Sequence, residues 1–139
     1  MCDVRPVFLH VPDGRWSFLP WTAARESDAL REMDAGLMPL PDTEWARGKC
    51  AFKLIQYMAC GVPVVASPVG ANVDVVNNGN GLLADSVGDW LDALRRLRDD
   101  PALRQSFGTT ARQTVEQLYS LRSTLPVMVK TIKAVAARR

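Results

Sequence analysis

The sequence predicts a parallel α/β domain of the Rossmann type, and three observations support this fold class. Residues 64–67 (Val-Val-Ala-Ser) continue an apolar run that is typical of a strand covered by helices on both faces. Gly61 stands just before that run, where a helix needs a left-handed cap. The helix predicted before Gly61 has apolar residues on one face: Leu54, Ile55, Met58 and Ala59.

Strand-length apolar segments also alternate with helical patterns through the first 85 residues, which favours the same fold class. A helix over about 24–33 is expected, with Thr22 as its cap and with Leu30 and Met33 facing inward. Residues 42–47 are expected to form a loop that leads into the helix before Gly61. Four parallel strands are predicted, at residues 16–20, 36–41, 64–67 and 81–84.

The last third of the chain is predicted to be helical. Ser86 and Asp89 form a capping box, followed by an apolar face of Trp90, Leu91, Leu94 and Leu97. Asp100 and Pro101 then cap and start a second helix, whose expected inward face is Leu103, Phe107, Ala111, Val115 and Leu118. A basic tail is expected to be helical from about Pro126 to residue 139.

Composition is consistent with one domain. The chain has 139 residues, 47% of them hydrophobic, and a net charge of +2, which does not indicate nucleic-acid binding. No stretch is apolar enough for a membrane span, so we expect a cytoplasmic protein whose basic tail could touch a membrane surface. The three cysteines lack a metal-ligand spacing and are expected to be reduced thiols. His10 has no partner at a spacing that would indicate catalysis.

The run GKCAFKLIQYMACGVPVVASPVGANVDVVNNGNGLLA resembles the nucleotide-sugar-binding core of the retaining GT-B glycosyltransferases of group 1. The family pattern is a glutamate, seven residues, a second glutamate, then Ala-x-Ala-Cys-Gly-x-Pro-Val-Val-Ala and a Gly-Leu-Leu strand. The resemblance covers roughly residues 18–119. Gln56 stands in place of the second glutamate and Gly48 in place of the first, and a branch of the family shares the Gly48, Lys49, Lys53 and Leu54 version of this loop.

The resemblance implies the second half of a GT-B C-terminal domain, with the central strands of a 3-2-1-4-5-6 sheet missing. On this hypothesis the chain is a fragment and one partial domain, with an uncertain start at 1–15, an αβ core at 16–85 and C-terminal helices at 86–139. Residues 7–11 could be a remnant strand. The implied function is to bind the nucleotide-sugar donor for glycosyl transfer. The alternative is a non-catalytic remnant, or a subunit of a split enzyme that joins a separate N-terminal domain or self-associates.

A helix N-terminus and nearby lysines suit a diphosphate, because unpaired N–H groups and cations both attract negative charge. By the resemblance, the residues at the end of the first strand would flank the base, and Gln56 would hydrogen-bond ribose hydroxyls. The predicted donor-binding residues are Gly48, Lys49, Cys50, Lys53, Gln56, Leu19 and Trp21. No catalytic side chain, metal or cofactor is expected.

The residue pattern alone also allows structural roles for this set. Lys53 and Gln56 could form a solvated helix face. Trp21 and Trp45 could cover loops as readily as stack on a ligand. We expect Cys50 to be a small buried residue rather than a reactive thiol.

Overall fold

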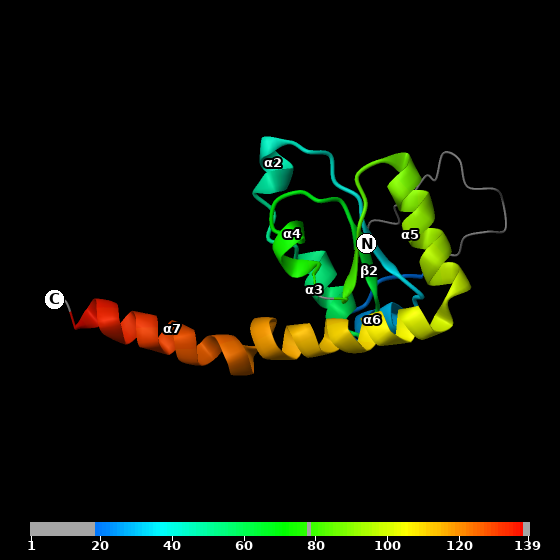
Figure 1. Ribbon diagram of the computed structural model, residues 1–139. Coiled ribbons are helices and arrows are strands. Elements are labelled where there is room, and N and C mark those ends of the chain that lie inside the picture. The colour runs from blue at the N-terminus through cyan, green and yellow to red at the C-terminus, as the bar shows by residue number, and fades with distance from the viewer. Residues whose placement is uncertain (1–18, 78, 138–139) are drawn as a thin grey trace.

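The computed structural model describes residues 19–77 and 79–137, and its centre is a parallel sheet of three strands in the described part (Figure 1). The strands are β1 (Gly36–Met38), β2 (Val64–Ala66) and β3 (Gly81–Leu83), in the order β1-β2-β3. Leu37 pairs with Val65, which pairs in turn with Leu82. The predicted class, a Rossmann-like parallel sheet with flanking helices and a helical C-terminal tail, is therefore confirmed.

The central strand β2 is buried on both faces, because its alternate side chains enter two apolar clusters. Val64 and Ala66 pack with residues of α3 (Phe52–Ala59) and α6 (Pro101–Thr114). Val65 instead packs with Ala93 and Leu97 of α5 (Val87–Asp99). The sheet thus separates a layer that contains α3 from a layer that contains α5.

The α3–β2 unit follows the sequence prediction closely. Leu54 and Met58 are fully buried, and Ile55 and Ala59 pack partly buried against the same cluster. Gly61 follows the helix with φ of +75°, the left-handed conformation expected there. The helix is therefore fixed to the sheet by one face.

The predicted strands differ from the observed ones at the N-terminal side. The remnant strand at 7–11 and residues 16–18 lie outside the described residues, whereas Leu19 and Pro20 are described and are not in a strand. β1 ends at Met38, before the prolines, so the range 36–41 was too long. Leu37 is 44% exposed, since β1 is the edge strand of the described sheet. The prediction of a buried strand was thus only partly right.

Three short helices accompany these strands: α1 precedes β1, and the other two lie in the connections between strands. α1 (Glu26–Arg31) is shorter than predicted, and the Thr22 carbonyl, rather than its side chain, accepts hydrogen bonds at its start. The expected loop 42–47 contains a one-turn helix, α2 (Glu44–Arg47), because the Thr43 hydroxyl accepts from the Ala46 N–H at 3.2 Å. α4 (Asn72–Val75) follows β2 and was not predicted.

The capping predictions for α5 and α6 are confirmed. Ser86 and Asp89 form a reciprocal capping box, and the Asp100 carboxylate accepts from the Leu103 N–H at 2.9 Å. The apolar faces are narrower than expected, because Leu91, Leu94 and Leu118 are exposed. These three leucines thus belong to the predicted apolar patterns but are not buried.

Asp89 should make the stability of α5 depend on pH. Hydrogen bonds from the backbone N–H and then the hydroxyl of Ser86 hold the pKa of Asp89 below its usual range. A depressed pKa in the folded state means that the carboxylate stabilises the protein above its unfolded pKa, and that this contribution is lost as the pH falls through the folded pKa. The free energy of unfolding, measured with urea at about pH 5 and about pH 3, should fall less between these two pH values for Asp89→Ala than for the wild type. Equal acid losses in the two proteins would contradict this role.

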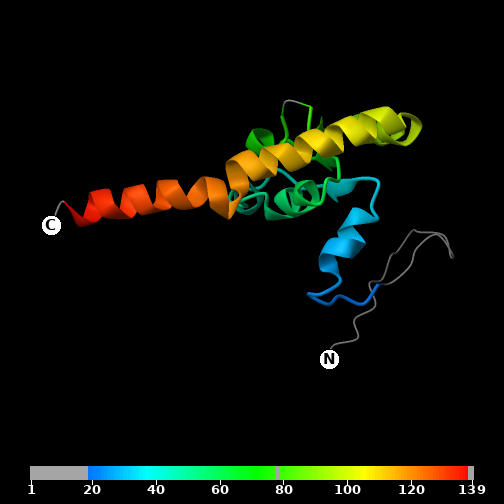
Figure 2. The same cartoon turned by 90° about the horizontal axis from the view of Figure 1, so that it is seen from below.

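The C-terminal helix projects away from the body of the molecule (Figures 1 and 2). α6 continues through a π-helical turn, Val115–Tyr119, into α7 (Leu121–Ala136). α7 begins five residues before the predicted start at Pro126, because the Ser120 hydroxyl accepts from the Ser123 N–H at 3.2 Å. None of its described residues is buried. No helix within the described ranges is long and apolar enough to cross a membrane.

Candidate functional site

A cavity of about 260 Å³ lies between α3 and the segment that leads into α1. Residues 19–22 form one wall, and Lys53 and Tyr57 of α3 form the opposite wall. Leu30 of α1 and Met33, which follows that helix, also line it, and Met33 is exposed, so the prediction that Met33 faces the core was wrong. The two walls come from distant parts of the sequence and meet because α1 lies against α3.

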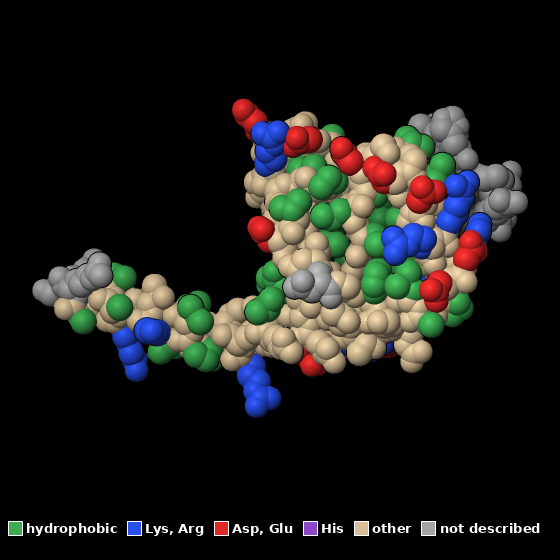
Figure 3. Space-filling model, viewed as in Figure 1, with side chains coloured by type: hydrophobic (Ala, Val, Ile, Leu, Met, Phe, Trp, Pro, Cys, Tyr) green, Lys and Arg blue, Asp and Glu red, His purple; other side chains and the backbone are tan. Residues whose placement is uncertain are grey.

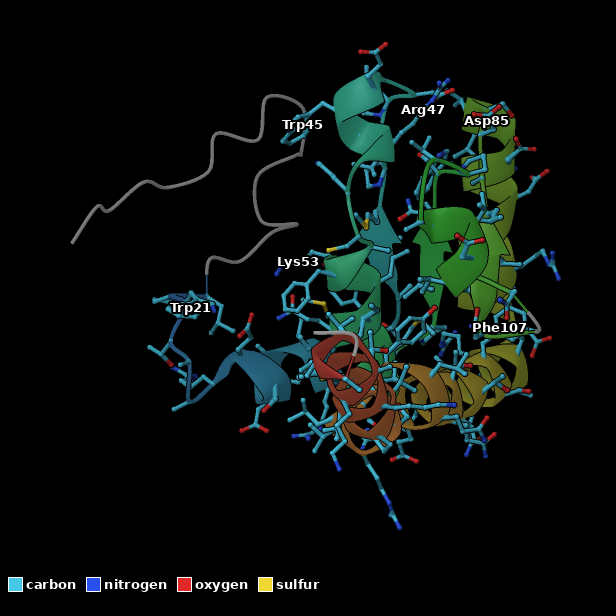
Figure 4. The ribbon with its side chains drawn as sticks, turned by 90° about the vertical axis from the view of Figure 1, so that its left-hand side faces the viewer. Trp21, Trp45, Arg47, Lys53, Asp85 and Phe107 are labelled. Atoms are coloured by element: carbon cyan, nitrogen blue, oxygen red, sulfur yellow. The ribbon has the colours of Figure 1, made fainter. Side chains whose placement is uncertain are left out.

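The cavity brings together three of the predicted donor-binding residues: Leu19, Trp21 and Lys53. The Trp21 side chain is 70% exposed, so its ring is available for stacking on a ligand. Lys53 is also exposed and lies on the same side of the molecule as Trp21 and Trp45 (Figure 4). The cavity therefore combines an exposed aromatic ring, that of Trp21, with the cation of Lys53.

Gln56 lies one turn from Lys53 on α3 and contacts α1. Its Nε2 donates to Glu26 Oε1 across 3.4 Å, at the long end for such a bond. Its Oε1 is buried and has no hydrogen-bond partner among the described residues. Gln56 thus presents a buried acceptor close to the cavity.

Gly48, Lys49 and Cys50 lie at the junction of α2 and α3 and do not line this cavity. Lys49 Nζ stands 4.0 Å from the centre of the Trp45 ring, a cation–π geometry. Cys50 is exposed, so the prediction that it is buried was wrong. Gly48 has an ordinary helical φ of −77°, and the left-handed residue before α3 is instead Ala51, with φ of +55°.

The start of α3 is electrostatically suited to an anion. No described side chain caps it, and its first turn contains no acidic residue. A helix N-terminus carries roughly half a positive charge on its free N–H groups. Lys49 and Lys53 flank that end of the helix and add two cations.

Acidic side chains gather elsewhere, at the end of the body where α2 and the start of α5 lie (Figure 3). Asp42 is paired there with Arg47, whose Nε stands 2.6 Å from Oδ1, and the hydrogen bond from Arg47 lowers the pKa of Asp42. Asp85 lies across the molecule from Lys53 (Figure 4). Lys53 thus lies away from this acidic end of the body.

The loop after β2 holds α2 in place next to this site. The buried Ser67 hydroxyl accepts from the Leu40 N–H at 2.9 Å, and the Asn72 amide donates to the Ser67 carbonyl at 3.0 Å. Gly70 has φ of +54°, and a Cβ there would stand 2.5 Å from the Arg47 carbonyl oxygen. Only glycine allows this close approach of the loop to α2.

Sequence reasoning missed three residues at the cavity: Arg25, Glu26 and Tyr57. Arg25 and Glu26 looked like ordinary helix-surface charges, and only their short distance in sequence from Trp21 could have indicated them. Tyr57 packs over Gly36, where a Cβ would stand 2.3 Å from the tyrosine Cγ. The described residues contain no group of three or more His, Cys, Asp or Glu side chains that could hold a metal ion.

Comparisons with known proteins agree with this architecture. The family described as "Glycosyl transferases group 1" matches residues 9–100. D-inositol 3-phosphate glycosyltransferase of Gordonia bronchialis is 36% identical over 105 residues, which cover 73% of this chain and 22% of the relative. The same enzyme of Pseudarthrobacter chlorophenolicus is 43% identical over 60 residues, which cover 41% of this chain and 14% of the relative.

A sucrose-phosphate synthase from Thermosynechococcus elongatus has a similar structure, with a TM-score of 0.59 and 25% identity over 75% of this chain and 26% of that chain. The aligned part of this chain thus corresponds to between 14 and 26% of these proteins. These findings confirm the resemblance to a part of a GT-B enzyme. Because the family match spans more than half of the 139 residues, this chain belongs to the group 1 glycosyltransferases.

Proposed function

We propose that this chain is the nucleotide-sugar-binding part of a retaining glycosyltransferase that moves a glycosyl group from an activated nucleotide donor to an acceptor. The observation that carries the proposal is that Trp21 and Lys53 share one cavity at the side of α3. An aromatic ring suits a base, and a cation beside a helix start suits a diphosphate. Membership of the group 1 family supports the same reading.

In this proposal the phosphates lie near the first turn of α3. Lys53, Lys49 and the free N–H groups of that turn would donate to phosphate oxygens, and Gly48 and Cys50 would contribute backbone beside them. When the glycosidic bond breaks, negative charge grows on the nucleoside diphosphate that leaves. Donors that are already oriented stabilise this charge in the transition state, which lowers the barrier. The described residues offer these groups without a metal ligand set.

The nucleoside would occupy the cavity itself. Trp21 would stack on the base, and Leu19 would form the wall next to it. Gln56 would accept from a ribose hydroxyl through its unpaired Oε1. The volume of about 260 Å³ is just below the range of about 300–1,000 Å³ for small-molecule pockets, so it suits a nucleoside better than a whole nucleotide sugar.

The acceptor would be bound by a second domain, as the resemblance to GT-B enzymes implies. In these enzymes the terminal helix crosses to the N-terminal domain, and α7 carries an apolar stripe that suits such a contact. Five residues of the stripe recur at spacings of three and four, and all are at least half exposed: Leu121, Leu125, Met128, Ile132 and Val135. Green side chains mark this projecting helix in Figure 3.

Lys53→Ala tests the phosphate assignment. We expect nucleoside diphosphate binding to weaken by about 1–3 kcal/mol, the range for charge-assisted hydrogen bonds. Binding of the bare nucleoside should barely change, because it lacks phosphates. Titration calorimetry with the 139-residue chain measures both affinities, and the diphosphate affinity of the wild type should also fall as salt rises.

Lys130→Ala is the matched control, since Lys130 is an exposed lysine of α7, far from the cavity in sequence. Its nucleotide affinity should equal that of the wild type. If Lys53→Ala weakens binding of the diphosphate and of the nucleoside equally, Lys53 supports the fold and the phosphate role must be withdrawn.

A further inference from the structure

The Gln56 carboxamide is held in one orientation by a residue from another helix. Its Nε2 faces Glu26 Oε1 at 3.4 Å. Its Oε1 is the single buried side-chain N or O atom without a hydrogen-bond partner in the described part of the chain. A buried acceptor without a partner destabilises the fold, so it marks a place where a partner is missing.

Rotation of the amide cannot remove this cost. If the carboxamide turned over, its oxygen would face the Glu26 carboxylate, and two acceptors would stand together. Glu26 therefore selects the orientation in which nitrogen points to α1 and oxygen points away. The partner that satisfies Oε1 must be a donor, such as a hydroxyl group.

Resting on the proposed function, we infer that Glu26 is a positioning residue that keeps Gln56 Oε1 as an acceptor for a ribose hydroxyl of the nucleotide. Group 1 enzymes that resemble this chain have a glutamate at the position of Gln56, and a carboxylate only accepts. Here the donor end of the amide is occupied by Glu26, so the free end behaves as that carboxylate oxygen would. Glu26 and Gln56 together thus provide one free acceptor oxygen, and the only carboxylate of the two is that of Glu26.

Neighbours of Gln56 line the cavity, although Gln56 itself is not among the lining residues. Glu26, Lys53 and Tyr57 all line it and are neighbours of Gln56 in space or sequence. Oε1 is buried, so a ribose hydroxyl reaches it only after a local shift that uncovers it.

The test compares ribose and deoxyribose forms of one nucleotide. Uridine or guanosine diphosphate, whichever the wild type binds more tightly, and its 2′,3′-dideoxy analogue are titrated calorimetrically into the full chain. If the ribose makes one net hydrogen bond to the protein, the wild type should bind the ribose form about three- to tenfold more tightly than the dideoxy form. Glu26→Ala should reduce the preference to below about twofold, because the amide is then free to rotate.

Two variants separate positioning from folding. Glu26→Gln should give a preference between those of Glu26→Ala and the wild type, since its amide oxygen can accept from Gln56 Nε2 while its amide nitrogen can also donate to a flipped Oε1. Glu32→Ala is the matched control, because Glu32 is an exposed residue that follows α1 and does not line the cavity. Its preference should equal that of the wild type.

An exchange of the two residues gives the sharpest result. Gln56→Glu alone places two carboxylates together, which should weaken binding of the ribose form. Adding Glu26→Gln to Gln56→Glu supplies a donor for one carboxylate oxygen and leaves the other free, so the preference should return. This recovery is a coupling between the two positions that a purely structural role of Glu26 would not produce.

The outcomes distinguish this inference from the proposed function. If the wild type prefers the ribose form and Glu26→Ala leaves that preference unchanged, or the exchange does not restore it, Glu26 does not position Gln56 and the nucleotide site stands. If the wild type binds both forms equally, Gln56 Oε1 does not meet the ribose and the inference is overturned. If the wild type binds no nucleotide, both proposals fail.

Discussion

Replacing Gly108 with alanine is expected to lower the free energy of unfolding by about 3 kcal/mol. Gly108 is buried where α6 crosses the end of α3, and a Cβ there would stand 2.2 Å from the Gly61 carbonyl oxygen. The position of a Cβ is fixed by its own backbone and the atom it meets is a backbone oxygen, so no side-chain rotation can relieve the clash. α6 would have to move away from α3, which would also weaken the hydrogen bond from the Arg112 guanidinium to the Ala59 carbonyl.

Urea unfolding followed by circular dichroism measures this loss, and Gly88→Ala is the control. Gly88 is also a helical glycine, but its Cβ would meet nothing closer than Ser86 Oγ at 3.6 Å. There the substitution should stabilise the protein by about 0.5–1 kcal/mol, because alanine favours helix. Equal stability of Gly108→Ala and the wild type would show that α3 and α6 do not cross at this point.

Leu54→Ala should lower the free energy of unfolding by about 2–5 kcal/mol, the range for a buried leucine that leaves a cavity. Leu54 is fully buried in the cluster that joins α3 to β2. The strands β1, β2 and β3 are each only three residues long, so the packing of α3 against them stabilises much of the sheet. A loss of this size is a large fraction of the 5–15 kcal/mol that is typical of a domain.

Phe52→Ala on the same helix is the comparison, measured by the same urea unfolding. Phe52 is 61% exposed, so its truncation should change stability by less than about 1 kcal/mol. A result in which both variants lose the same free energy would place the buried face of α3 elsewhere. It would also remove the basis for placing Lys53 beside the cavity.

Local signals in the sequence were sufficient for the α3–β2 unit and for the helix caps. Gly61 predicted the left-handed end of α3, and the Ser86–Asp89 pair predicted the start of α5. These features depend on backbone conformation and on hydrogen bonds between residues close in the chain, so the chain fixes them before it packs. The one-turn helix at residues 44–47 escaped prediction, because a single turn has too few residues for an apolar period to be visible.

Burial could not be derived in the same way. Periodicity correctly grouped Leu91 and Leu94 with Leu97 as one apolar face of α5, yet only Leu97 is buried. A period states which side chains point in a similar direction, whereas burial also requires a neighbour to cover them. Leu91, Leu94 and Leu118 stay exposed, and the sequence contains no sign of this.

The same distinction between local pattern and tertiary packing applies to the candidate site. The sequence alone determined that Lys53 and Gln56 lie off the apolar face of their helix, because a 3.6-residue period places them there. Only the tertiary structure decided that Lys53 shares a cavity with Trp21, that Gln56 meets Glu26, and that Cys50 is exposed. These relations depend on how α1 lies against α3, and contacts between distant segments are set by packing rather than by any local pattern.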